Sequence, residues 1–165
     1  MTEKQKYAFN KIIAALPDDC REAFREVAEY AISLGYMPVL KGSKKDYIDF
    51  TKSKVKRTIL KIDAAPASPR LAIKYFALPA YSGIFYEGVE VRVNLLEEMG
   101  HKVRCWGCGK CDGTQGYNYV LCDGREGFLC GGGLLDLAGF SAENVSEIKA
   151  ALKAQDDYFM SNEEK

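Results

Sequence analysis

The sequence predicts an α+β fold in which N-terminal helices pack on a mostly antiparallel sheet, followed by a zinc-ribbon-like cysteine hairpin and a C-terminal helix. Three observations support it: helical apolar spacing over residues 19–34, alternation from residue 36 onward, and helical spacing again after residue 141. The chain has 165 residues, 47% of them apolar, which suffices for one core without disulfides. We therefore expect a single domain over 1–165, with a metal-stabilised subregion at about 101–135.

Two helices are expected at the N-terminus. The first covers residues 2–16, with Thr2 as its N-cap. In the second, Asp19 and Glu22 have the spacing of a capping box, and Gly35 fits the C-terminal stop. The apolar face of the second helix advances in steps of four and three residues and comprises Cys20, Phe24, Val27, Ala31 and Leu34.

Alternation of apolar and polar residues predicts strands at 36–40, 48–51, 58–62 and 71–78. Residues 71–78 also fit a short helix that Ser68-Pro69 would open. Residues 87–100 are ambiguous as well, because their valines alternate like those of a strand but partly share a helix face with Leu96. We favour a helix for this segment.

The C-terminal helix is expected to begin at Ser141, a favourable N-cap residue. Its apolar face comprises Val145, Ile148, Leu152 and Phe159. This helix would close the core after the cysteine hairpin.

No apolar run reaches the roughly 18 residues that a transmembrane helix needs. The first ten residues, MTEKQKYAFN, lack the apolar core of a signal peptide. We therefore expect a cytosolic protein without membrane contact. In that compartment clustered cysteines bind metals or serve redox chemistry rather than form disulfides.

Five of the six cysteines lie within residues 105–130, with the spacing C-x2-C-x2-C-x10-C-x7-C. The segment CWGCGK (105–110) resembles the knuckle of a zinc ribbon, in which the two intervening residues let both thiolates face one ion. Four thiolates make a closed tetrahedral site with no position for a catalytic water. The metal would instead hold together the glycine-rich stretch 107–116, which has few core residues.

An Asp-Gly pair at 123–124 predicts a two-residue type I′ turn between strands 117–122 and 125–130. Such a turn would pair Tyr119 with Phe128 and Tyr117 with Cys130. Cys122 and Cys130 would then lie about 17 Å apart along the ladder and on opposite faces. One ion could not bind both.

The predicted metal ligands are therefore Cys105, Cys108, Cys111 and Cys130, with His101 and Cys122 in reserve. Zinc is the expected metal, because thiolates suit it and the knuckle is typical of it. The same spacing also suits an iron–sulfur cluster, although no second cysteine group accompanies it. Unliganded thiols, or disulfides formed on oxidation, are the remaining interpretation.

The formal net charge is zero, with 23 basic and 23 acidic residues, but the charges are unevenly distributed. Residues 41–61 hold eight basic and two acidic residues, so this segment carries +6 and the remainder −6. One interpretation is a nucleic-acid-binding face whose phosphate contacts are Lys52, Lys54, Lys56 and Arg57. The other is a solvated edge hairpin whose lysines discourage aggregation.

Tyr75, Tyr81, Phe85 and Tyr86 cluster in a stretch that contains Pro and Gly. They either line a small-molecule pocket or belong to the core. The sequence contains no G-x-S-x-G, Walker or G-x-G-x-x-G motif, and no Ser-His-Asp arrangement is apparent. This favours a non-catalytic protein without excluding an enzyme.

The order of three segments resembles the start of the YdhG-like family of uncharacterised α+β domains. These segments are LPDDCREAFREVAEY (16–30), GYMPVL (35–40) and DYIDFTKSK (46–54). The resemblance covers about residues 16–78 and does not extend to the cysteine segment. It implies a compact fold of helices on a curved sheet, and no established activity or functional residue.

The first functional hypothesis is a cytosolic, non-catalytic domain with a structural zinc that binds a small molecule or a protein partner. The second is nucleic-acid binding by the hairpin of residues 41–61. The third is a thiol redox protein acting through the C-x-x-C pair of Cys108 and Cys111, although this pair lacks the strand-to-helix context of thioredoxin-like motifs.

Overall fold

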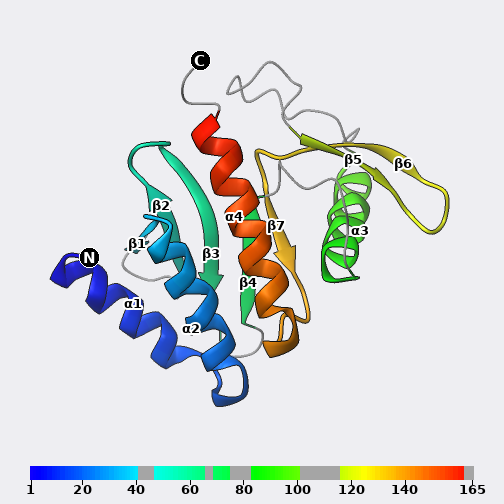
Figure 1. Cartoon of the computed structure of the whole chain (residues 1–165). Helices are drawn as coiled ribbons and strands as arrows, with labels where there is room; N and C mark the ends of the chain where they lie inside the picture. The colour runs from blue at the N-terminus through cyan, green and yellow to red at the C-terminus, as the bar shows by residue number, and fades with distance from the viewer. Residues whose placement is uncertain (41–46, 66–68, 75–82, 101–115, 162–165) are drawn as a thin grey trace.

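A computed structural model describes residues 1–40, 47–65, 69–74, 83–100 and 116–161. The fold is α+β, as predicted, with a five-stranded antiparallel sheet and a separate two-stranded hairpin. Helices α2 and α4 lie side by side across one face of the sheet, while α3 lies beyond its β7 edge (Figure 1). The elements are α1 (Glu3–Ala15), α2 (Asp18–Ser33), β1 (Met37–Leu40), β2 (Tyr47–Lys52), β3 (Arg57–Asp63), β4 (Arg70–Lys74), α3 (Gly83–Glu98), β5 (Gly116–Val120), β6 (Glu126–Cys130), β7 (Leu134–Leu137) and α4 (Val145–Ser161).

The caps of the first two helices agree only in part with the sequence prediction. Thr2 caps α1 as expected, in a reciprocal capping box with Gln5. The predicted capping box at the start of α2 is wrong, because Pro17 is the N-cap and Asp19 already lies in the first turn. Gly35 stops α2 as predicted, with a φ of +91°.

The sheet has the order β1-β2-β3-β4-β7, and every neighbouring pair is antiparallel. Along the strands, successive side chains point alternately to a core face and to an outer face. The outer face carries charged residues such as Lys61, Asp63 and Asp136. The core side chains of the four strands β2, β3, β4 and β7 are Ile48, Phe50, Leu60, Ile62, Leu71, Ile73, Leu135 and Leu137, all at most 2% exposed. They pack with the buried faces of α2 and α4 in one core.

The ambiguous segment 87–100 is helical, and the helix α3 begins earlier, at Gly83. It packs closely against β7 because Gly88 has no side chain: a Cβ there would lie 2.8 Å from the Asp136 carbonyl oxygen. Strand β7 itself was not predicted from the sequence. None of the helices in the described part of the chain combines the length and the hydrophobicity that crossing a membrane requires.

The predicted two-residue turn of the β5–β6 hairpin is wrong. The loop has three residues, Cys122 to Gly124: the Gly124 N–H donates to the Leu121 carbonyl at 3.0 Å, and Gly124 has a φ of +85°. The register therefore moves by one residue, so that Tyr119 faces Gly127 instead of Phe128. Burial explains the shift, because it brings Leu129 onto the same buried face as Tyr119 and Leu121.

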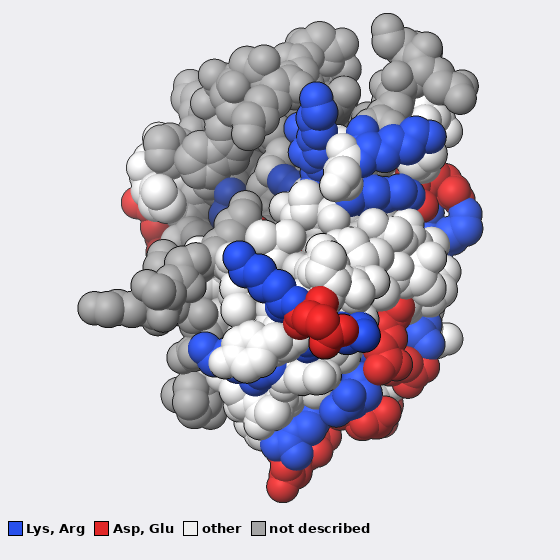
Figure 2. All heavy atoms as spheres, turned by 90° about the vertical axis from the view of Figure 1, so that its left-hand side faces the viewer, with Lys and Arg blue, Asp and Glu red and all other residues white. Residues whose placement is uncertain are grey.

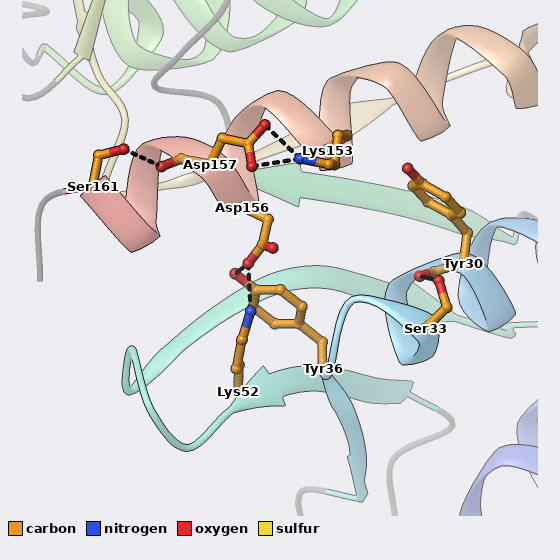
Figure 3. A network of polar contacts seen from close by, with 8 residues as sticks. All are labelled: Tyr30, Ser33, Tyr36, Lys52, Lys153, Asp156, Asp157 and Ser161. Carbon is orange, nitrogen blue, oxygen red and sulfur yellow. Dashed lines mark hydrogen bonds and ion pairs between the residues drawn. The ribbon is translucent and has the colours of Figure 1, made fainter.

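The C-terminal helix is tied to the sheet by a buried polar cluster formed by Tyr36, Lys52 and Asp156 (Figure 3). One carboxylate oxygen of Asp156 accepts hydrogen bonds from the Tyr36 hydroxyl at 2.9 Å and from the Lys52 ammonium at 2.8 Å. The ammonium also lies 5.2 Å from the centre of the Tyr36 ring. The cluster connects the residue after the α2 stop, the end of β2 and the last turns of α4.

Replacing Asp156 by Ala should lower the free energy of unfolding by about 3 kcal/mol, because the Lys52 charge and the Tyr36 hydroxyl would stay buried without their acceptor. Replacing the adjacent Asp157 by Ala breaks only its exposed ion pair with Lys153 and should cost at most about 0.5 kcal/mol. Urea denaturation followed by circular dichroism measures both values. Equal losses would show that the buried cluster contributes no more than a surface ion pair.

Candidate metal centre

Cys130 is the last residue of β6 and faces Gly116, the first residue of β5. Gly116 follows Cys111 by only five residues in the chain. The polypeptide that leaves Cys111 therefore arrives at the strand position opposite Cys130. Of the candidate centre, the structure describes only this end of the hairpin and the loop after it.

The Cys130 sulfur contacts the glycine run that follows it. The Gly132 N–H donates to the Cys130 Sγ at 3.4 Å, and Cys130 is only partly exposed. A Cβ on Gly132 would lie 3.3 Å from the same sulfur, so the backbone passes close to one side of it. A backbone N–H aimed at a sulfur is the arrangement that stabilises negative charge on a thiolate ligand.

The opposite residue, Gly116, has no room for a side chain. A Cβ there would lie 2.1 Å from the Leu129 carbonyl oxygen and 2.4 Å from Cζ of Phe128. Phe128 lies on the same face of the hairpin as Cys130, two residues before it. Its ring therefore covers the start of β5 and provides an apolar flank next to the cysteine.

Cys122 lies at the other end of the hairpin, exposed in the three-residue loop. Its backbone N–H donates to the Tyr86 hydroxyl oxygen. The side-chain hydrogen bond with Cys122 raises the pKa of Tyr86 above its ordinary value. Although the register differs from the prediction, Cys122 and Cys130 stay at opposite ends of the hairpin, which keeps them from sharing one ion.

The sixth cysteine, Cys20, lies in the first turn of α2. Its thiol donates to the Pro17 carbonyl at 3.5 Å, and burial, followed by the nearby Asp19 carboxylate, raises its pKa. Cys20 therefore uses its thiol as a donor to the backbone of this turn.

The predicted ligands Cys105, Cys108 and Cys111, and the reserve ligand His101, lie outside the described residues. Within the part of the chain that the structure describes, no three His, Cys, Asp or Glu side chains gather as a metal site. The ligand set consequently remains a prediction. Cys130 is the one first-choice ligand that lies within the described residues.

The predicted aromatic pocket is described only in part, because Tyr75 and Tyr81 lie outside the described residues. Phe85 is 2% exposed and belongs to the core, and Tyr86 packs against that core while its hydroxyl reaches Cys122. On the described surface, a hollow of about 470 Å³ lies elsewhere, along the hairpin. It is lined by Asn118, Tyr119, Val120, Glu126, Gly127 and Phe128.

The four predicted phosphate contacts differ in their surroundings. Lys52 is engaged by Asp156 and its side chain is only 17% exposed. Lys54 and Lys56 are exposed in the turn between β2 and β3, and Arg57 is half-buried. Lys and Arg side chains gather towards the top of this side of the molecule (Figure 2), so a basic surface exists although Lys52 is largely withdrawn from it.

Sequence reasoning missed two contacts of this region. One is the Gly132 N–H to Cys130 Sγ hydrogen bond, and the other is an approach of Lys74 to the Gly132 carbonyl. The only sequence signal for either is the run C-G-G-G at 130–133, which frees the backbone to approach the sulfur.

Comparison with known proteins finds no matching family model, no similar curated protein and no similar solved structure. The resemblance of residues 16–78 to the YdhG-like family therefore stays a prediction.

Replacing Gly116 by Ala should destabilise the hairpin by about 2 kcal/mol, because the added Cβ overlaps backbone that cannot move without breaking the strand pairing. Gly83 offers a matched control, since a Cβ there meets nothing within 4 Å. Hydrogen exchange of the β5 and β6 amides measures the effect locally. Unchanged protection in the Gly116 variant would contradict the register described above.

Proposed function

We propose that the chain is a cytosolic zinc-binding α+β domain in which Cys105, Cys108, Cys111 and Cys130 hold one structural Zn²⁺. The observation that carries the proposal is the Cys130 sulfur, which accepts the Gly132 N–H at 3.4 Å at the strand end facing Gly116. Backbone donors of this kind surround thiolates that bind metals and limit the charge left on the sulfur.

The chain length between Cys111 and the hairpin supports the ligand choice. Gly116 pairs directly with Cys130, and five residues span at most about 17 Å. A turn in this linker would therefore bring Cys111 to the Cys130 sulfur without disturbing β5. Cys122, at the far end of the hairpin, would require the hairpin to open.

A site of four thiolates has no open coordination position, so the proposed role of the metal is structural. Residues 107–116 contain four glycines and no aliphatic or aromatic residue. Such a stretch buries too little apolar surface to offset its loss of conformational entropy, and metal binding would supply the missing free energy. An iron–sulfur cluster is the alternative occupant and would be recognised by its visible absorption.

The ligand or partner of the domain would bind near the same hairpin. The hollow of about 470 Å³ beside β5 and β6 combines the Asn118 amide and the Glu126 carboxylate with the Phe128 ring. Polar groups beside an aromatic ring can orient and hold a small molecule or a peptide. A metal that holds the hairpin in place would also preserve this surface.

Zinc content and thiol reactivity of two cysteine variants test the proposal. Wild-type protein purified without an affinity tag should hold one zinc per chain and show no visible absorption, and its ligand thiols should react slowly with iodoacetamide. The Cys130→Ser variant should lose the metal, whereas the matched Cys122→Ser variant should keep it.

Metal-free wild-type protein would reject the proposal. Fast-reacting thiols of low pKa at Cys108 and Cys111 would instead favour the redox alternative. Iron together with visible absorption would show that the site holds an iron–sulfur cluster instead of zinc. Loss of zinc from both variants would show that the ligand set is wrong.

Nucleic-acid binding has less support, because Lys52 is already neutralised by Asp156. Its specific support is the exposure of Lys54 and Lys56 in the β2–β3 turn. We expect filter binding to show no retention of DNA or RNA at about 150 mM salt. Retention that falls with salt and is lost in a Lys54→Ala, Lys56→Ala double variant would establish this second function.

A further inference from the structure

Helix α3 and the residue after it carry a row of apolar side chains that are exposed to solvent. Val91 is 53% exposed, Leu95 44% and Met99 54%, and their spacing of four residues aligns them along one side of the helix. The helical hydrogen bonding includes Met99, whose N–H donates to the Leu95 carbonyl at 3.1 Å. Single exposed apolar residues are ordinary, whereas a contiguous row on one element marks an interaction surface.

This exposed row continues the side of α3 that packs on β7. Ile84 and Gly88 precede it at the same helical spacing, and both are buried. Gly88 lies against β7, where an added Cβ would be 3.3 Å from Cγ of Leu135, and one turn later Arg92 lies next to Gly133, just before the strand begins. Helix and strand therefore run in opposite directions, and the exposed row lies where β7 no longer covers the helix (Figure 1).

A polar row with two carboxylates runs beside the exposed row. Glu87, Asn94 and Glu98 are exposed and follow one another by seven and four residues, which places them along one flank of the apolar side chains. Residues 83–98 contain four glutamates and a single arginine. That arginine, Arg92, is directed at Gly133 on the other flank. The exposed side of α3 therefore combines an apolar row with an acidic flank.

We propose that the exposed row and its acidic flank are a docking surface for a basic amphipathic helix of a partner protein. Side chains four residues apart form a ridge, and a second helix packs its own ridges into the grooves beside it. The eight-residue step from Val91 to Met99 rises about 12 Å, which matches roughly two turns of a partner helix. Lys or Arg residues beside the apolar stripe of that helix would complement Glu87 and Glu98.

The charge of α3 decides between this partner and other occupants. A second copy of the chain would bring the same negative charge to the contact through its own α3, and an anionic membrane surface would be repelled by the two carboxylates. The inference goes beyond the proposed function and does not depend on the metal. The contact of α3 with the β5–β6 hairpin uses the opposite side of the helix, where Glu97 pairs with Arg125 at 2.5 Å.

Fluorescence anisotropy with a labelled peptide tests the apolar row. The probe is a helical peptide of about three heptads, with leucine at positions a and d and lysine at e and g. Wild-type protein should bind it saturably. A Leu95→Gln, Met99→Gln double variant should bind at least about tenfold more weakly, because glutamine keeps the helix propensity and removes the apolar ridge. Val39→Gln is the matched control, since Val39 is 40% exposed on β1 and should not affect binding.

A charge reversal tests the acidic flank independently. The Glu87→Lys, Glu98→Lys double variant should weaken binding by about tenfold or more and remove most of its dependence on salt. The Glu29→Lys, Glu143→Lys variant makes the same change in net charge at exposed positions on other helices and should retain wild-type affinity. Circular dichroism checks that each variant is folded, and the charge-reversed pair supplies the test if the glutamine variant does not fold.

A wild-type chain that does not bind the peptide would overturn the inference, as would control variants that lose as much affinity as the α3 variants. Sedimentation velocity addresses the remaining occupant. Self-association of the wild-type chain that is absent from the Leu95→Gln, Met99→Gln variant would make a second copy the occupant and would also overturn the inference. The zinc content, which tests the proposed function, is unaffected by any of these results.

Discussion

The pairing of β4 with β7 is the constraint on which the second half of the molecule depends. It joins Leu71 to Leu137 and Ile73 to Leu135 on the core face, although about sixty residues separate the two strands in the chain. Helix α3, the cysteine segment and the β5–β6 hairpin all lie between these two strands, in the excursion of residues 75–133. Closing so long a loop costs conformational entropy, which the packing of α3 on β7 and the proposed metal would offset.

The return of the chain after β7 completes the main core. Helix α4 lies beside α2 and buries Ile148, Leu152 and Phe159, and Phe24 of α2 packs edge-to-face with Phe140 just before it. The buried Asp156 cluster then fixes the far end of α4 against β2. Apolar packing brings the layers together, and one directional polar cluster sets how the last helix is oriented.

Most elements in the first half of the fold can be predicted from the sequence. Apolar spacing identifies α2, and the glycine stop at Gly35 follows from its backbone freedom. Two other features depend on tertiary burial: the hairpin register follows Leu129 rather than the Asp-Gly pair, and β7 has only four residues after a glycine run. The separation of Cys122 from Cys130 was predictable, whereas the contacts of Lys52 and Lys74 were not, because their partners Asp156 and Gly132 are distant in sequence.

The two ends of the excursion lie side by side in the sheet. Lys74 and Leu134 are direct partners in adjacent strands, so a short turn between them would connect β4 to β7. A chain without the intervening residues would keep α1, α2, α4 and all five strands of the sheet in their present order. The cysteine-bearing segment therefore occupies the place of a hairpin loop, a position where insertions are tolerated, although α3 and the β5–β6 hairpin share the core of the main sheet.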